Sequence, residues 1–151
     1  PLWDMQAKGA FAGLRAGDGP AELVLAVMEG VAFSARLALE ALEAAGGCRP
    51  AELRGGGGGT ESDTWCRIRA ATFGRPFARM AARDAGALGA LVIGGVAAGL
   101  MPDLAAAAQR LVPVDRFFDP DPSAAALADR RFALWRQLYD RIRPINGGLW
   151  R

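Results

Sequence analysis

Five consecutive glycines, Gly55 to Gly59, fix a turn near the middle of a chain that otherwise favours helices. Glycine has no Cβ, so such a run reaches backbone conformations closed to other residues and does not continue a helix. Glu52-Leu53-Arg54 before the run favours a short strand, and Ser62 after it is typical of a helix N-cap. The sequence therefore predicts a strand, a glycine loop and a helix in that order.

A long helix is predicted before this turn, over about residues 20–45. Asp18 is placed to cap its start, and Gly46-Gly47 favours a left-handed end. Residues 1–17 are rich in glycine and are expected to be extended. The apolar residues that recur on one face of the predicted helix are Leu23, Val27, Val31 and Ala35.

The helix that begins at Ser62 is expected to end at Gly74, because Pro76 follows closely. Pro76–Met80 is a candidate second strand. Asp84 is then placed to cap Ala85–Met101, a stretch of 17 residues without charge. Its glycines, Gly86, Gly89, Gly95 and Gly99, predict a buried helix packed closely against other backbone. The alternative is a membrane span, although about 17 residues is the lower limit for one.

Two further helices are predicted towards the C-terminus. Asp103 is expected to cap a short helix that ends at Arg110, and Leu111–Phe118 is expected to be a connector. Ser123 is expected to cap the last helix, which Pro144 should end, leaving residues 144–151 as a loose tail. The predicted face of the last helix consists of Leu127, Arg131, Leu134, Leu138 and Ile142, with Phe132, Trp135 and Tyr139 beside it.

Composition excludes several kinds of site. The chain of 151 residues has no histidine, which excludes histidine-based zinc sites, histidine-dependent nucleophile pairs and a histidine proton shuttle. Its two cysteines, Cys48 and Cys66, form no metal or disulfide motif, and a cytoplasmic location is expected. The arginines near the C-terminus lie on a predicted helix that also carries Asp129 and Asp140, which favours a solvated helix face over nucleic-acid binding. These arginines are Arg130, Arg131, Arg136, Arg141 and Arg143. The aspartates mostly precede helices, so no catalytic or metal-binding residue is assigned.

The glycine loop is the one feature that resembles a site. Glycines allow a ligand to approach the backbone, and the start of the following helix offers unpaired N–H groups, which together favour phosphate binding. Gly55–Gly59 lacks the lysine of a P-loop and the spacing of a dinucleotide fingerprint. From these residues alone, a flexible linker or tight turn is an equally good interpretation.

Several segments in order resemble the FGGY carbohydrate kinases. Gly9–Leu14 and Glu22–Glu29 are similar to the second signature of that family. Gly57–Trp65 is similar to its G-G-G-x-x-S-x-x-W pattern, and Asp84–Ala90 to its acidic-A-G-A-L-G-A segment. Asp119-Pro120-Asp121-Pro122 resembles the sequence that leads into the last helix of the family. Pro1-Leu2-Trp3-Asp4 is most similar to the xylulokinase-type branch.

The resemblance implies an α/β fold, a partial actin-like, ribonuclease-H-like ATPase domain that is rich in helices with a few short strands. Residues 1–151 would be the C-terminal portion of the second, ATP-binding domain. By the same resemblance, Gly58 and Ser62 would touch the nucleotide, and Gly57 and Gly59 would form the supporting turn. The cofactors would be ATP and Mg²⁺.

The resemblance also implies the reaction, transfer of the ATP γ-phosphoryl group to a sugar hydroxyl, with a pentulose such as xylulose as the expected acceptor. The catalytic aspartate of the family and most sugar contacts would lie in a missing N-terminal half, so these residues alone are expected to be inactive. A homodimer is possible, and no nucleic-acid or membrane partner is expected. Gly55 and Gly56 stand where relatives have strand-forming residues. The alternatives that remain are a non-catalytic nucleotide-binding or interaction module and a membrane-associated protein.

Overall fold

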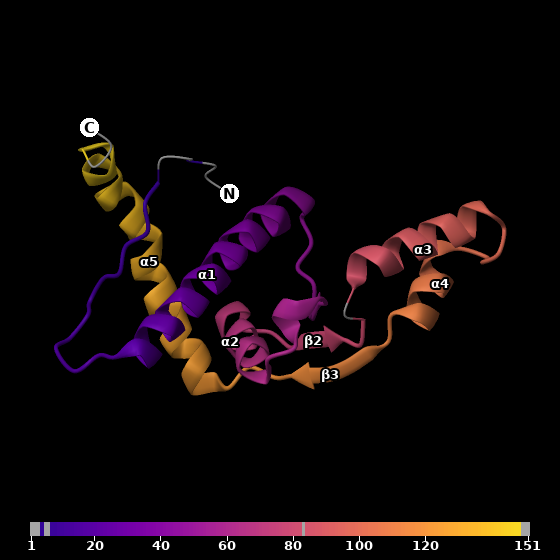
Figure 1. Cartoon of the computed structure of the whole chain (residues 1–151), viewed down its shortest axis with the longest axis horizontal. Coiled ribbons are helices and arrows are strands. Elements are labelled where there is room, and N and C mark those ends of the chain that lie inside the picture. Colours follow the sequence, from indigo (N-terminus) through magenta and orange to yellow (C-terminus); the bar gives the residue numbers. More distant parts are fainter. Residues whose placement is uncertain (1–3, 5–6, 83, 149–151) are drawn as a thin grey trace. The chain divides into compact units, whose positions relative to one another are not determined.

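The computed structural model describes residues 4, 7–82 and 84–148, which form two compact units (Figure 1). Unit 1 comprises Pro1–Arg49 and Pro122–Arg151, and unit 2 comprises Pro50–Asp121. Unit 2 is thus inserted, in sequence, between the two segments that form unit 1. The first three residues of the chain and the predicted tail beyond residue 148 lie outside the described residues.

Unit 2 is built on a three-stranded sheet in the order β1-β2-β3. Strand β1 (Leu53–Gly55) pairs in parallel with β2 (Phe77–Met80), and β2 pairs in antiparallel fashion with β3 (Val114–Phe118). A parallel pair needs a crossover, which here consists of the 3₁₀ turn η1 (Gly58–Thr60) and helix α2 (Asp63–Phe73). The predicted strand, glycine loop, helix and second strand are confirmed. Strand β3 was missed, because Val112 and Val114 alone gave only a weak alternation.

The core of unit 2 lies where α2 packs against the sheet. Cys66 and Ala70 from α2 meet Phe77 and Phe118 from β2 and β3, and all four side chains are buried. Gly55, the last residue of strand β1, lies against the Phe77 ring: a Cβ at Gly55 would lie 2.3 Å from the ring atom Cζ. Glycine at position 55 therefore makes room for a buried aromatic ring on the neighbouring strand.

Helices α3 (Ala85–Ala97) and α4 (Leu104–Leu111) complete unit 2 and contact each other. The predicted caps are confirmed, because Asp84 accepts a hydrogen bond from the Ala87 amide and Asp103 accepts one from the Ala106 amide. The prediction of a buried α3 is wrong: only Val92 and Gly95 are buried, and only Gly95 makes a close approach, to the Met101 side chain. The other predicted close approaches are absent: a Cβ at Gly89 or Gly99 would have no atom within 4 Å, and one at Gly86 would meet only the N-cap residue Asp84.

The described part of the chain contains no helix with both the length and the hydropathy needed to cross a lipid bilayer. Helix α3 has the most apolar sequence, but it ends at Ala97, where a turn containing Gly99 with φ of +72° follows. The structure therefore does not support the alternative of a membrane span over Ala85–Met101.

Unit 1 consists of α1 (Pro20–Gly46), α5 (Pro122–Gly148) and an extended segment that leads into α1. Phe33 on α1 packs against Ala128 and Phe132 on α5, and Trp135 completes this cluster. Ion pairs flank it, in which Arg36 binds Asp129 and Arg131 binds Glu29. The Tyr139 hydroxyl donates a 2.7 Å hydrogen bond to Asp4, which ties the N-terminal segment to α5.

The boundaries of these two helices differ from the prediction in three places. Gly19, not Asp18, is the N-cap of α1, because the Glu22 carboxylate accepts from the Gly19 amide while Asp18 accepts from the Arg15 amide. Helix α5 starts one residue before Ser123 and continues through Pro144 to Gly148. Proline removes one hydrogen bond and clashes with the preceding turn, which bends a helix without always ending it.

The faces predicted for the long helices are also wrong. On α1 the buried residues are Ala32 and Phe33, and Val27 and Val31 are about half exposed. On α5 the buried face runs through Ala128 and Phe132. The prediction placed Phe132 beside the buried face and did not include Ala128. The apolar residues of both helices cover more than one face, so periodicity did not single out the buried one. The left-handed end at Gly47 is confirmed by its φ of +60°.

Candidate nucleotide-binding loop

The glycine loop is a short, ordered turn rather than a slack linker. Gly57 has φ of +88°, a conformation that favours glycine, and precedes the 3₁₀ turn Gly58–Thr60. The Thr60 amide donates to the Gly57 carbonyl at 2.9 Å, and the Glu61 amide donates to the Gly58 carbonyl at 3.2 Å. The first amides of such a turn, those of Gly58 and Gly59, have no partner within the turn and are available to an acceptor.

Thr60 anchors this loop to the core of unit 2. Its side chain is buried, and its hydroxyl donates a 2.7 Å hydrogen bond to the Gly57 carbonyl. The thiol of Cys66, one turn into α2, donates to the Thr60 carbonyl at 3.3 Å. Burial raises the pKa of this thiol, with smaller opposing effects from Arg79 and Arg69, so it stays protonated and donating. Thr60 and Cys66 therefore fix the loop to the core of unit 2, while Gly58 and Gly59 are exposed.

Ser62 begins the helix that follows the loop. Its hydroxyl accepts a hydrogen bond of 3.3 Å from the Trp65 amide, which makes it the N-cap of α2, as predicted. Ser62 thus has a structural role whether or not it also contacts a ligand. Asp63, the first residue of α2, adds negative charge at the helix start.

The four predicted site residues do not occupy equivalent positions. Gly57 lines a cavity of about 440 Å³, whereas Gly58 is exposed on the loop and has no atom within 4 Å of the position of a Cβ. At Gly59 such a Cβ would lie 3.6 Å from an amino group of Arg69. The loop therefore offers open backbone at Gly58, a cation beside Gly59 and a cavity beside Gly57. The cavity is lined by Gly57, Thr60, Glu61, Arg79, Met80, Ala81, Ala82 and Asp115.

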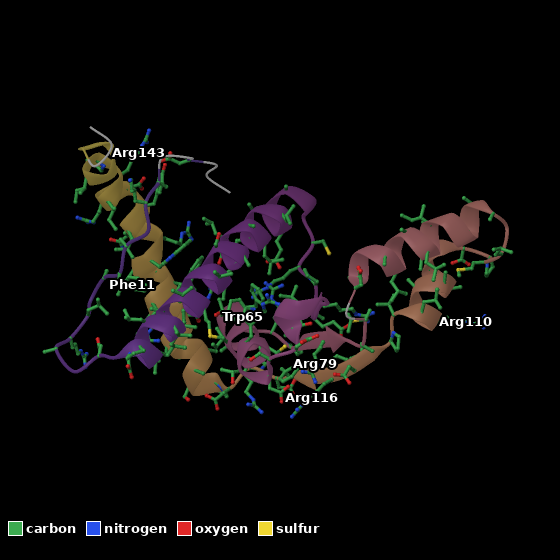
Figure 2. The ribbon with its side chains drawn as sticks, in the orientation of Figure 1. Phe11, Trp65, Arg79, Arg110, Arg116 and Arg143 are labelled. Carbon is green, nitrogen blue, oxygen red and sulfur yellow. The ribbon has the colours of Figure 1, made fainter. Side chains whose placement is uncertain are left out.

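Arg79 and Asp115 also line the cavity, and sequence reasoning missed both. Figure 2 shows Arg79 and Arg116 close together on the sheet, and both bind Asp63, at 2.8 and 2.6 Å. Arg79 also binds Asp115 at 2.6 Å, and the hydrogen bond with Asp115 is the largest cause that raises the pKa of Arg79. One feature of the sequence could have pointed to Arg79: it is a charged residue within the short strand Phe77–Met80. A strand that lies between two other strands has little room for a charge.

The described residues contain no group of three or more metal-ligating side chains that could hold a metal ion. Asp63 and Asp115, two of the carboxylates near the loop, are instead engaged by arginines. What this site offers is therefore a set of exposed backbone amides with Arg69 and Arg79 nearby, beside an open pocket whose lining also contains Glu61 and Asp115. The backbone amides are the part of this arrangement that suits an anionic group.

Comparison with known proteins agrees with the fold. Residues 1–98 match the profile of the "FGGY family of carbohydrate kinases, C-terminal domain". The chain is 37% identical over 120 residues to the glycerol kinase of Citrifermentans bemidjiense, covering 80% of this chain and 24% of that protein. It therefore spans about a quarter of the length of that relative.

Solved structures of the same family superimpose over nearly the whole chain. The gluconate kinase of Lactobacillus acidophilus has a TM-score of 0.84 at 28% identity, and the match covers 99% of this chain and 30% of that one. The ligand-bound xylulose kinase of the same organism has a TM-score of 0.82 at 27% identity, with the same coverage. The α/β fold, rich in helices with a small sheet, is therefore part of an actin-like ATPase fold, as the resemblance implied. The chain belongs to the FGGY family of carbohydrate kinases.

Proposed function

We propose that this chain is the ATP-binding part of a carbohydrate kinase and that the loop Gly57–Ser62 holds the nucleotide. Phosphoryl transfer requires positioning and charge neutralisation from both walls of a cleft, and this chain would supply one wall. The family's phosphoryl acceptor is a hydroxyl group, and the catalytic base that takes its proton would be supplied by sequence preceding residue 1. The residues described here would therefore bind nucleotide without turning it over.

The observation that carries this proposal is the open backbone at Gly58. Phosphate oxygens bind backbone N–H groups at short range, and a glycine without neighbours within 4 Å permits that approach. The buried Thr60 holds the turn in one conformation, so the amides need no reordering when a ligand arrives. Mg²⁺ would reach the site bound mainly to the nucleotide phosphates, because it usually takes few protein ligands in kinase sites.

Calorimetric titration of the chain with Mg·ATP and with ADP tests the nucleotide role. Gly58→Ala adds one methyl group where the structure has open space, so we expect its thermal unfolding to match the unaltered chain. The added methyl group would keep a phosphate from the Gly58 amide, and loss of one charge-assisted hydrogen bond corresponds to roughly a 10- to 100-fold weaker affinity for ATP. Gly46→Ala, at the end of α1 and also without neighbours, is the matched control and should bind as the unaltered chain does.

Equal nucleotide affinity in Gly58→Ala and the unaltered chain would contradict the proposed contact. The acceptor is tested separately, with the chain joined to its preceding sequence and supplied with ATP. We propose a pentulose such as xylulose as acceptor, supported by the xylulose kinase match, and a cytoplasmic enzyme. Gluconate and glycerol are the competing acceptors in the assay, because a gluconate kinase and glycerol kinases are also similar to the chain.

A further inference from the structure

The side chain of Arg79 connects three segments around the candidate cavity. Its Nη1 atom donates to Asp63 at 2.8 Å and, at a longer 3.4 Å, to the backbone carbonyl of Glu61. Its Nε atom donates to Asp115 at 2.6 Å. Only 19% of the side chain is exposed, and Arg79 and Asp115 both line the cavity. One guanidinium thus holds the end of the glycine loop, the start of α2 and strand β3.

If the ligand is a nucleotide, a cation is needed to neutralise the negative charges around this cavity. Glu61 and Asp115 line the cavity, and Asp63 begins the helix beside it; each of these carboxylates would repel a phosphate chain if it were unpaired. Arg79 neutralises two of the three, Asp63 and Asp115, from one position. Arg116 binds the second oxygen of Asp63, but half of its side chain is exposed and it does not line the cavity.

The sheet itself does not require an arginine at this position. In the strand register Arg79 stands opposite Gly55 on one side and Arg116 on the other, and like charges in directly opposed pairs destabilise a sheet. The arrangement is tolerated because Asp63 lies between the two guanidinium groups and binds both. Without its carboxylate partners, Arg79 would destabilise the strand. We therefore expect its role to lie in the site rather than in the sheet.

We propose that Arg79 is a positioning residue of the nucleotide site: it cancels the charges of Asp63 and Asp115 and fixes the segment Glu61–Asp63, so that a phosphate chain can occupy the cavity. This inference rests on the proposed function, because it takes the ligand to be a nucleotide. Arg79 itself need not touch the ligand. Its effect depends on ligand charge, which separates this role from a purely structural one.

The test compares three ligands with graded charge, ATP, ADP and adenosine, by calorimetry on the whole chain. Arg79→Met keeps the length of the side chain and removes its charge. We expect about tenfold weaker binding of ATP, a smaller loss for ADP and less than a twofold change for adenosine, because adenosine carries no charge. Arg116→Met removes the same charge from the same sheet and is the matched control, for which all three affinities should change less than twofold.

A second variant guards against a folding defect. Arg79→Met/Asp115→Asn removes the carboxylate that Arg79→Met leaves uncompensated, and we expect it to recover most of the ATP affinity. Hydrogen exchange of the Thr60 and Glu61 amides, measured without ligand, should be faster in Arg79→Met than in Arg116→Met. Equal losses for ATP and adenosine, or no recovery in the double variant, would overturn the charge role.

The failure of the proposed function has a different signature. If the unaltered chain binds none of the three ligands, the nucleotide assignment is wrong, whatever the variants do. The exchange measurement then still decides whether Arg79 fixes the loop, because it needs no ligand. Unchanged exchange of both amides in Arg79→Met would show that Arg79 does not position the segment.

Discussion

Replacement of Gly55 by alanine is the sharpest test of how the glycine-rich strand is accommodated. Strand β1 ends at Gly55, and the added Cβ would lie 2.3 Å from Cζ of Phe77. Carbon atoms in contact are normally about 3.5–4.0 Å apart, so the Phe77 ring or the strand must move by more than about 1 Å. The ring is only 4% exposed and packs in the core of unit 2, so it has little room to move.

The size of the effect follows from two opposing contributions. Overpacking of a well-filled core costs about 1–3 kcal/mol, and the buried ring places this case near the upper end. Replacing glycine in a strand returns roughly 0.5–1 kcal/mol, because alanine loses less backbone entropy on folding. We therefore expect Gly55→Ala to lower the free energy of unfolding by about 2 kcal/mol.

Urea denaturation followed by circular dichroism measures this change. With a slope of about 2 kcal/mol per molar, the midpoint for unit 2 should fall by about 1 M. Gly56→Ala is the control, because its nearest neighbours lie at 3.5 Å, an ordinary contact distance. Combining Gly55→Ala with Phe77→Leu should cost less than the sum of the two single changes, since the smaller side chain relieves the overlap. An unchanged midpoint in Gly55→Ala would refute the packing argument.

Three further predictions concern the two cysteines and the core of unit 1. At pH 8 a thiol reagent should modify exposed Cys48 at once and buried Cys66 only after unfolding, measured as one against two reactive thiols per chain. Because burial raises the pKa of Cys66, the unfolded chain loses that proton first, so stability should fall as the pH rises above about 9, less steeply in Cys66→Ala. In unit 1, Arg36 binds Asp129 and lies 4.4 Å from the centre of the Phe132 ring. Arg36→Met should therefore lower the unfolding free energy by about 1–2 kcal/mol, whereas Arg130→Met should change it little.

Local chemistry made much of the fold predictable. The N-caps Ser62, Asp84 and Asp103 and the C-cap glycines Gly47 and Gly74 lie where sequence reasoning placed them. Each of these residues acts through a hydrogen bond or backbone conformation within a few positions of itself. Such effects are written in the adjacent sequence and do not depend on tertiary contacts.

Features that depend on distant partners were predicted less well. The burial of Phe33 on α1 depends on Phe132, about a hundred positions away, and the apolar residues around α1 give several equivalent faces. Strand β3 was missed because β2, with which it pairs, lies more than thirty residues earlier. Propensity within a window carries no record of such pairing.

The same limit applied to the candidate site. The glycine loop was recognisable from its own residues and from the family resemblance. The charges that surround it were not, because Arg79, Asp63 and Asp115 come from three different elements. Sequence reasoning predicted the backbone part of the candidate site and missed the side chains that the sheet brings together.

The insertion of unit 2 between α1 and α5 has a consequence for biosynthesis. Phe33 can pack against Phe132 only after the ribosome has made the roughly one hundred residues between them, which takes about 5–20 s at usual elongation rates. Unit 2 is continuous in sequence and is free to fold during this interval. Until then Phe33 lacks its partners on α5, whereas unit 2 already has every residue of its own core.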